Sequence, residues 1–302
     1  MTGIIILNYN TPKQTIECVN SIIKFEGNSV SIVVVDNCST DDSYNILKEF
    51  CLNFSNVLFV VTQKNGGYSY GNNYGTLYLH TGIEEIVFIN SDIVFQNDAI
   101  TKMKNMLHKE KKNNVAIIGP EIYGNHGQIA RRKLRSIDYL LRIRPFCYFH
   151  IRTSRNIKFN LQESKVFSGM VSGCCFMIKK SVFDIINGFD ENVFLYSEED
   201  IIAYKLDQIN YKVAICDEAI VLHKHSESIS KKGLAFRRKF SLLSPLYCLK
   251  VYEQKSFGLI YLCIFCALIQ YSIFSIFNNS YRKELLDFLK RLGCIIKIKE
   301  VL

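Results

Sequence analysis

The stretch that decides the fold is residues 86–95, Ile86-Val87-Phe88-Ile89-Asn90-Ser91-Asp92-Ile93-Val94-Phe95. A short apolar run ends abruptly in three polar residues, and a second apolar run follows at once. The first run is typical of a buried strand. In a parallel sheet the carboxyl end of such a strand faces a ligand crevice, so Asp92 stands where a carboxylate can hold a divalent cation against a phosphate. From these ten residues alone, an ordinary polar turn between two strands is the simpler explanation.

Two earlier apolar runs end in the same way. Residues 4–7 are followed by Asn-Tyr-Asn-Thr-Pro, in which the proline is placed to open a helix. Residues 32–35 are followed by a polar segment in which Ser39 or Thr40 can cap the next helix. Strands that alternate with helices predict a parallel α/β sheet.

A third strand is expected at residues 57–61, followed by a segment rich in glycine and asparagine at 65–75. We expect this segment to be a loop that approaches a ligand closely, because glycine tolerates close backbone contact, and a helix through Leu77 and Leu79 to follow it. All the polar clusters then fall at the same ends of the strands, which predicts a nucleotide-type site. No G-x-x-x-x-G-K-[ST] or G-x-G-x-x-G motif follows the first strand, which argues against a P-loop enzyme or a dinucleotide dehydrogenase.

The second half of the chain continues the alternation. We expect a helix at about 97–111 and strands at 115–118, 171–178, 213–216 and 219–222. Three successive acids, Glu198, Glu199 and Asp200, open an apolar-periodic stretch. They are well placed for a helix N-terminus, either as functional carboxylates or as simple compensation of the helix dipole.

The pattern as a whole resembles the family 2 glycosyltransferases with a GT-A fold, in their bacterial rhamnosyltransferase-like branch, which builds surface polysaccharides such as O-antigen and capsule. The resemblance covers about residues 3–225. The matching pieces are Asn8-Tyr9-Asn10, Val35 to Asp41, Asn65-x-Gly67, Gly71-Asn72-Asn73-x-Gly75, Asn90-Ser91-Asp92, Gly173 to Ile178, Gly188-Phe189-Asp190-Glu191, Phe194-Leu195-Tyr196-x-Glu198-Glu199 and His223.

The resemblance implies a role for each matching position. Glu199 matches the general base, with Glu198 as the other member of the catalytic acid pair. Asp92 and His223 match ligands of a Mg²⁺ or Mn²⁺ ion. The positions that match the donor-binding site are Tyr9, Asn10, Asp36, Asn65, Asn72, Asn73, Ser91 and Asp92.

Two departures from the family pattern bear on these roles. The first acid of the metal-binding D-x-D motif is Asn90 here, and an amide is a weaker metal ligand than a carboxylate. The usual Glu-Asp pair is Glu198-Glu199. Matching the family's pair to Glu199-Asp200 is also possible. We prefer the match to Glu198-Glu199, because Tyr196 then stands two residues before the pair, as in the family pattern.

The resemblance further implies an inverting transfer of rhamnose or another hexose. The donor would be a nucleotide-diphosphate sugar and the acceptor a polyprenyl-diphosphate-linked saccharide, with no nucleic acid partner. Two other functions stay open: a nucleotidyltransferase that makes sugar nucleotides, or a catalytically inactive glycan-binding or scaffold protein. A nucleotidyltransferase would need a glycine-rich basic loop after the first strand. The one feature that favours an inactive protein is Asn90.

Residues 257–277 carry no charge and are long enough to span a bilayer. Spanning, an in-plane helix and a helix docked on the globular part all remain open. We therefore expect a GT-A domain at residues 1–235 and a helical, membrane-associating extension at 236–302, on the cytoplasmic side of the inner or plasma membrane.

The amino-acid composition agrees with a folded domain followed by a membrane-associating extension. The chain has 302 residues, 48% of them hydrophobic, so it can bury a core. The net charge of +9 is concentrated at about residues 131–158 and 231–239, which favours phosphates or anionic lipid unless these are only solvated basic faces. The eleven cysteines form no regular framework, and we expect reduced, mostly buried thiols of a cytosolic protein.

Overall fold

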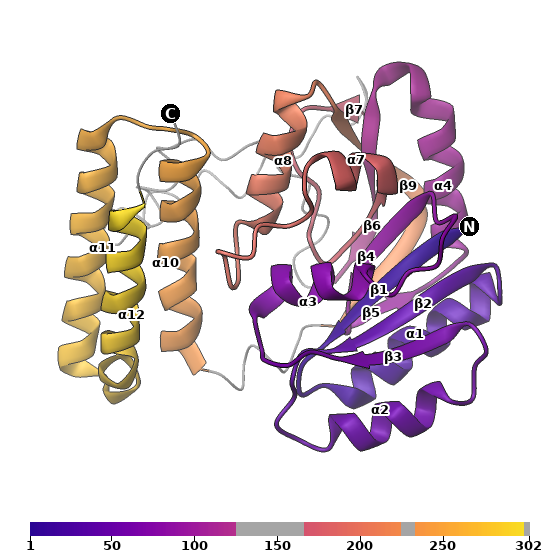
Figure 1. The fold of residues 1–302 in the computed structure, drawn as a ribbon, viewed down its shortest axis with the longest axis horizontal. Helices are drawn as coiled ribbons and strands as arrows, with labels where there is room; N and C mark the ends of the chain where they lie inside the picture. Colours follow the sequence, from indigo (N-terminus) through magenta and orange to yellow (C-terminus); the bar gives the residue numbers. More distant parts are fainter. Residues whose placement is uncertain (125–165, 225–232, 299–302) are drawn as a thin grey trace.

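The computed structural model describes residues 1–124, 166–224 and 233–298. A nine-stranded sheet with helices on both faces forms the larger part, and three long helices form a bundle beside it (Figure 1). The basic cluster expected at 131–158, together with Lys231 and Lys232, lies outside the described residues. The ten described cysteines are free thiols, and seven of them are buried.

The first half of the sheet is parallel, as the alternation predicted. Its strands lie in the order β3-β2-β1-β4. Their bounds are β1 Thr2–Asn8, β2 Val30–Asp36, β3 Val57–Val61 and β4 Glu85–Asn90. Register places Asn8 opposite Asp36 and Leu7 opposite Asn90, so the polar ends of three strands meet at one edge.

The second half of the sheet is mixed. It continues from β4 in the order β8-β6-β9-β5, with β7 paired to β9. The bounds are β5 Ile93–Phe95, β6 Val115–Tyr123, β7 Val166–Phe167, β8 Cys175–Lys179 and β9 Lys212–His223. Strand β8 runs antiparallel between β4 and β6, and it begins at Cys175 rather than at residue 171.

The expectation of two short strands at 213–216 and 219–222 was wrong. Both belong to β9, which runs parallel to β6 without ending. The register shifts so that Pro120 pairs with Cys216 and Glu121 with Ile220. The intervening polar residues bulge out of the ladder, and their polarity suggested a turn that is not there.

Helices cover both faces of the sheet. One apolar core includes residues of α1 (Pro12–Glu26), α2 (Ser43–Cys51) and α4 (Ala99–Lys109). The opposite core includes residues of α3 (Gly67–Thr76), α7 (Lys180–Ile185) and α8 (Glu198–Gln208). A short 3-10 turn, η1 (Glu110–Asn113), follows α4.

The segment rich in glycine and asparagine is a helix and not the expected loop. Helix α3 begins at Gly67 and ends at Thr76, so the helix expected through Leu77 and Leu79 has already finished. Gly71 and Gly75 are one helical turn apart, and a Cβ at either position would overlap side chains of β1 or β2. The glycines therefore let α3 lie close against the sheet, at the edge where the polar strand ends meet.

The bundle consists of α10 (Gly233–Val251), α11 (Phe257–Phe277) and α12 (Asn279–Lys297). Its core includes Tyr271 stacked on Phe288, with ring centroids 4.2 Å apart. Lys239 is buried there and pairs with Glu284 and Asp287 of α12. Figure 1 places α10 next to the sheet domain and α11 on the far side. The predicted domain boundary at residue 235 stays a prediction.

Among the described residues, α11 is the one helix long and apolar enough to cross a membrane, with a mean hydropathy of 2.1. Only one of its faces is packed against the other two helices, and 39% of its most apolar window is buried. Its other face exposes large apolar side chains, namely Phe257, Tyr261, Leu262, Phe265, Ile269, Ile273, Ile276 and Phe277.

Candidate active site

Asp92 lies in the turn between β4 and β5, and its side chain is only 1% exposed. One carboxylate oxygen, Oδ2, is 3.2 Å from Nε2 of His223. The two residues are 131 positions apart, but β5 pairs with β9 so that Ile93 lies opposite His223. The backbone of Lys224 also donates a hydrogen bond to the carbonyl of Asp92. Strand pairing therefore assembles this corner.

The donor atoms of the corner fit a divalent cation. The second carboxylate oxygen of Asp92, Oδ1, is buried and has no hydrogen-bond partner in the described part of the chain. A buried carboxylate oxygen is costly unless it is paired or coordinates a metal. The His223 side chain is 27% exposed, so the corner is open to solvent on that side. Carboxylate oxygen together with imidazole nitrogen suits Mn²⁺, and carboxylate oxygen suits Mg²⁺.

A second group of potential metal ligands, Glu84, Glu85 and His108, lies elsewhere. Glu85 begins β4 whereas Asn90 ends it, so the two groups are about 17 Å apart along the strand. The Glu85 carboxylate accepts hydrogen bonds from Thr2 and His108 and pairs with Lys104. Burial alone would raise the pKa of Glu85, but these partners lower it. This group is an ion-pair cluster that holds the opposite edge of the sheet.

The residues predicted to bind the donor at the ends of β1 and β2 do meet in space. Asp36 is buried and accepts a 2.6 Å hydrogen bond from Nδ2 of Asn8. Asn10 exchanges two hydrogen bonds with Thr40, and Tyr9 beside it is half-buried. These contacts fix the two loops that follow the parallel strands.

Ser91 and Asn65 complete the part of the edge that the structure brings together. Ser91 Oγ lies 2.9 Å from Oγ1 of Thr11, at the start of α1. Oδ1 of Asn65 accepts a hydrogen bond from the backbone of Gly67, the first residue of α3.

The amide of Asn73 is fully engaged within the protein, whereas Asn72 has only its Nδ2 engaged and its buried Oδ1 has no hydrogen-bond partner among the described residues. Asn72 is fully buried, and its Nδ2 donates to the carbonyl of Tyr68 within α3. Asn73 donates to Phe189 and Glu191 and accepts from the backbone of Phe189. Both predicted donor contacts stay predictions, and Asn73 has a clear role in holding the loop that begins at residue 189.

Glu199 lies in the first turn of α8, beside the backbone of Gly173. Its Oε1 accepts a 3.0 Å hydrogen bond from the Gly173 amide. Gly173 is in turn held by Tyr68, whose hydroxyl donates a 2.6 Å hydrogen bond to its carbonyl. A Cβ on Gly173 would overlap the Glu199 carboxyl group, so only glycine leaves room for this contact.

Glu198 has a different environment. It is almost fully buried, and its Oε2 has no hydrogen-bond partner among the described residues. Burial, and then the neighbouring carboxylates of Glu199 and Asp200, raise the pKa of Glu198 well above its ordinary value. Glu198 therefore favours its protonated form, whereas Glu199 is the half-exposed carboxylate with a fixed hydrogen bond.

Two residues of backbone connect Glu199 with the Asp92 corner. Gly173 binds Glu199, and the carbonyl of the next residue, Cys174, accepts a 2.9 Å hydrogen bond from the amide of Asn90. Burial raises the pKa of the Cys174 thiol to about 12, and the charges of Asp92 and Glu199 add to this rise. The charges of both carboxylates thus act on one buried thiol.

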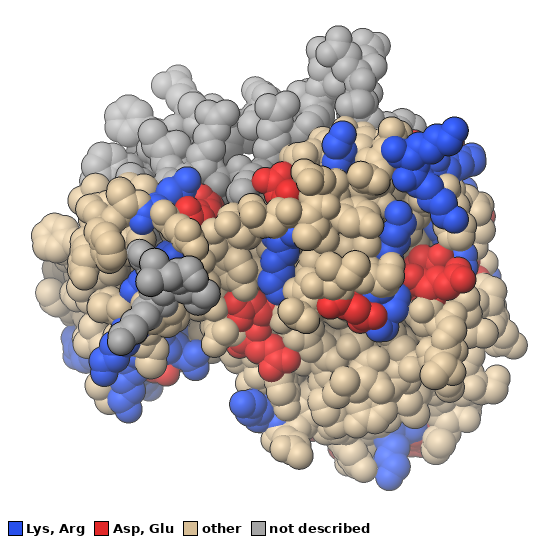
Figure 2. Space-filling model, turned by 45° about the horizontal axis from the view of Figure 1, so that its top comes forward, with Lys and Arg blue, Asp and Glu red and all other residues tan. Residues whose placement is uncertain are grey.

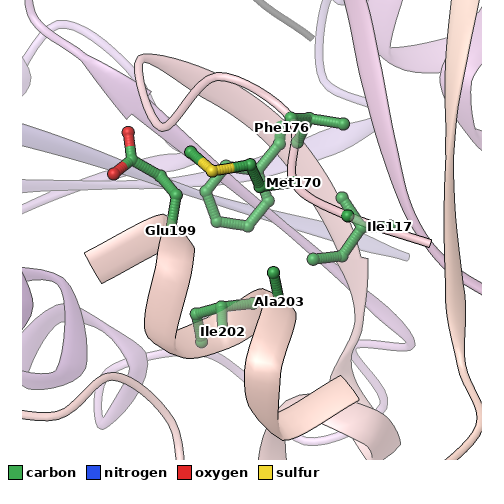
Figure 3. A pocket seen from close by; sticks show the side chains of 8 residues that line it. Ile117, Met170, Phe176, Glu199, Ile202 and Ala203 are labelled. Atoms are coloured by element: carbon green, nitrogen blue, oxygen red, sulfur yellow. The ribbon is translucent and has the colours of Figure 1, made fainter. Parts of the chain in front are cut away.

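Glu199 also borders a small apolar pocket. Figure 3 shows its carboxylate pointing away from the apolar side chains of the pocket. The lining residues are Ile117, Gly169, Met170, Val171, Phe176, Glu199, Ile202 and Ala203. Glu199 is the only titratable residue of that lining.

Sequence reasoning missed several residues that shape this site. Tyr68 lies in the segment that the sequence predicts to be a loop, yet its hydroxyl anchors Gly173. Arg237, near the start of α10, is close enough to Tyr196 to lower the pKa of its hydroxyl, although burial raises that pKa overall. The spacing of Gly67, Gly71 and Gly75 could have identified α3, but no local pattern connects α10 with the site.

Comparison with known proteins places the fold. The crystal structure of GalNAc-T7 with UDP, GalNAc and Mn²⁺ superposes with a TM-score of 0.59 at 13% identity, over 83% of this chain and 48% of that one. The mannosyltransferase PcManGT from Pyrobaculum calidifontis, in complex with GDP-Man and Mn²⁺, gives 0.56 at 12% identity, over 97% and 86%. The fold is therefore that of the GT-A glycosyltransferases.

Sequence comparison then gives the family. The model of glycosyl transferase family 2 matches residues 3–186, more than half of the chain, and the chain belongs to this family.

Two curated relatives are similar over most of the chain. The O-antigen chain rhamnosyltransferase WbaN of Salmonella anatum is 25% identical over 228 residues, which are 75% of this chain and 65% of the relative. The low-salt glycan biosynthesis hexosyltransferase Agl10 of Haloferax volcanii is 24% identical over 253 residues, which are 81% and 76%. The match to WbaN thus spans slightly less than two thirds of that relative's length.

Proposed function

We propose that this protein transfers rhamnose or another hexose from a nucleotide-diphosphate sugar to a saccharide acceptor in the synthesis of a surface polysaccharide. The observation that carries this proposal is the connection of two carboxylates through Gly173 and Cys174. One belongs to the Asp92–His223 corner and the other to Glu199. A charge-stabilising corner and a base on two sides of one backbone segment are what sugar transfer requires.

Glu199 is the proposed base. Its carboxylate takes the proton of the acceptor hydroxyl while the acceptor oxygen forms a bond to the anomeric carbon. The bond from that carbon to the diphosphate oxygen breaks, and the nucleoside diphosphate leaves with the electron pair. Attack from the face opposite the leaving group inverts the anomeric configuration, so no second nucleophilic carboxylate is needed. Gly173, itself anchored by Tyr68, fixes the base on the acceptor side.

Asp92 and His223 would hold the divalent cation, with the unpartnered Oδ1 of Asp92 as one ligand. A bound Mg²⁺ or Mn²⁺ ion supplies positive charge that stabilises the leaving diphosphate. Because Asn90 replaces the first acid of the D-x-D motif, Asp92 is the one carboxylate that this motif supplies. The GalNAc-T7 and PcManGT structures contain Mn²⁺ together with a nucleotide or a nucleotide sugar, which supports the assignment.

The acceptor is proposed to be a saccharide linked to a polyprenyl diphosphate, with the enzyme on the cytoplasmic surface of the membrane. The exposed apolar face of α11 supports this location. Helix α12 packs along α11 and carries charges throughout, including Glu284, Asp287 and Arg291. Because lipid does not tolerate such a helix, contact through the outer face of α11 fits better than a span.

The proposal is tested by measuring sugar-nucleotide binding and hydrolysis with and without Mn²⁺ or Mg²⁺, across UDP-, GDP- and dTDP-linked hexoses. We expect one nucleotide class to bind in a metal-dependent way and to be hydrolysed slowly when water replaces the acceptor. A protein that binds saccharides but neither binds nor hydrolyses any sugar nucleotide would be a glycan-binding protein instead. Synthesis of a sugar nucleotide from a sugar phosphate and a nucleoside triphosphate would identify a nucleotidyltransferase.

The membrane location has its own test. We expect the protein to float with vesicles that contain anionic lipid, because α11 exposes Phe265 and Ile269, and basic side chains stand at the end of the bundle where α11 turns into α12 (Figure 2). The double variant Phe265→Asp/Ile269→Asp should reduce the bound fraction about tenfold. The matched control is Leu52→Asp/Leu77→Asp, which places the same two charges on exposed apolar sites of the sheet domain.

Binding that survives the double variant would contradict contact through the outer face of α11. A wild-type protein that is monodisperse without detergent and ignores vesicles would contradict the membrane location itself. A change from dimer to monomer in the double variant, without vesicle binding in the wild type, would assign the face to a second copy of the chain.

A further inference from the structure

We propose that the helical bundle positions the base Glu199 through the loop of residues 189–197, and that Asp190, Tyr247 and Tyr252 form the decisive contact. This inference rests on the proposed role of Glu199. The loop leads directly into α8, whose first turn carries Glu198 and Glu199. Any shift of the loop therefore shifts the base.

One side of the loop is fixed to the sheet domain. The carbonyl of Phe194 accepts a 3.0 Å hydrogen bond from the amide of Tyr68. Gly67 has a φ of +88°, and a Cβ there would overlap the Phe194 backbone. Nδ2 of Asn73 donates a 2.9 Å hydrogen bond to the carbonyl of Phe189. Helix α3 thus holds the loop at two points, at the loop's first residue through Asn73 and in the loop's interior through Tyr68.

The other side of the loop is fixed to the bundle. Oδ2 of Asp190 accepts hydrogen bonds from the hydroxyls of Tyr247 at 2.7 Å and Tyr252 at 2.6 Å. Ser244 Oγ donates to the carbonyl of Leu195 at 2.7 Å. All three donors belong to α10 or to the residue just after it, so a single helix supplies the whole set of contacts.

Aromatic packing reinforces these hydrogen bonds. Phe194 stacks on Phe240 of α10 with ring centroids 4.7 Å apart. Val193 from the loop and Ile201 from α8 belong to the apolar core of the bundle and not to either core of the sheet domain. The loop and the start of α8 are therefore built into the bundle as much as into the sheet domain.

Two residues between the anchors and the base have left-handed backbone conformations. Tyr196 has a φ of +69° and Ser197 a φ of +65°. Such conformations cost free energy in residues other than glycine, so the surroundings must impose them. They turn the chain sharply from the anchored loop into α8, which makes the direction of Glu199 depend on the anchors.

The Asp190 contact is the strongest candidate for this control. Burial alone would raise the pKa of Asp190, but hydrogen bonds from Tyr252, Asn192 and Tyr247 lower it below the ordinary value. Burial, and then the bond to the Asp190 carboxylate, raise the pKa of both tyrosines, so both remain hydroxyl donors. Charge-assisted hydrogen bonds of this kind are short and hold their geometry closely.

The test is the double variant Tyr247→Phe/Tyr252→Phe, which removes two hydroxyls and keeps the rings. We expect its kcat for sugar-nucleotide turnover to fall at least tenfold, while the KM and the calorimetric Kd for the donor with Mn²⁺ stay within about twofold. The donor edge lies on the other side of Gly173 and should be unaffected. Tyr252→Phe alone serves as the milder variant if the double variant folds poorly.

Tyr271→Phe is the matched control. Its hydroxyl is buried in the same bundle and donates to the carbonyl of Ala235, with no contact to the loop. We expect it to lower the Tm without changing kcat. Asp190→Asn added to the double variant should cause little further loss of kcat, because all three changes act through one contact.

An unchanged kcat in Tyr247→Phe/Tyr252→Phe, or an equal loss of kcat in Tyr271→Phe, would overturn the inference. Glu199→Gln measured in the same preparation separates this failure from failure of the proposed function. If Glu199→Gln remains active, the base is misassigned. If it is inactive while the tyrosine variant has full activity, only the positioning role is wrong.

Discussion

Glu199→Gln is expected to lower the rate of sugar transfer by about 10² to 10⁴-fold, the contribution usual for a general base. The amide cannot take the acceptor proton, but it keeps nearly the same shape and can still accept the hydrogen bond from Gly173. Donor binding should survive, because the Asp92 corner lies on the other side of Cys174. Steady-state transfer kinetics and calorimetry with the donor and Mn²⁺ measure the two effects.

Two further variants sharpen this result. Glu198→Gln should cost little activity, because burial already favours the protonated form of Glu198, which an amide resembles. Gly173→Ala should reduce the rate while the protein stays folded, because the new Cβ displaces the movable Glu199 side chain. If Glu198→Gln is the inactive variant and Glu199→Gln is active, the base is Glu198. Loss of donor binding in Glu199→Gln would place Glu199 in the donor site.

Asp92→Asn is expected to have the second large effect, a loss of about 10³-fold in metal-dependent turnover. A bound cation contributes several kcal/mol to stabilising the leaving group, and each 1.4 kcal/mol corresponds to about tenfold in rate. Unlike Glu199→Gln, this variant should weaken both the Mn²⁺ affinity and the metal-dependent donor affinity. Titration with Mn²⁺, followed by turnover at saturating metal, separates these two losses.

His223→Ala should reduce Mn²⁺ affinity as well, because His223 lies 3.2 Å from the Asp92 carboxylate and is the only histidine beside it within residues 1–124, 166–224 and 233–298. The matched control is Glu84→Gln, an exposed acid in the cluster at the far end of β4, which should leave Mn²⁺ affinity and turnover unchanged. Unaltered Mn²⁺ affinity in Asp92→Asn would contradict the metal assignment.

The parallel half of the sheet could be predicted because its signals are local. The apolar runs at residues 4–7 and 32–35 and the run before Asn90 are buried strands, and register alone brings their polar ends together. The proximity of Asp92 and His223 rests on the pairing of β5 with β9. Sequence spacing does not reveal that pairing, and only the resemblance to a family suggested that the two residues share a site.

Where prediction failed, long-range packing outweighed local composition. A stretch with glycines at 67, 71 and 75 has low intrinsic helix propensity. It is nevertheless a helix, because the face without side chains at Gly71 and Gly75 packs closely against β1 and β2. The contact of Asp190 with Tyr247 and Tyr252 joins residues about sixty positions apart, and no periodic pattern in the sequence predicts it.

The shared core of the loop and the bundle bears on how an active enzyme can be produced. Removing everything after residue 235 would strip Val193 and Ile201 of their packing partners and leave Asp190 without its two hydroxyl donors. Such a shortened chain would gain solubility from the loss of α11 and lose the support of its base. Polar replacements on the outer face of α11, at Phe265 and Ile269 for example, are the better route to a detergent-free preparation, because they leave every contact with the loop in place.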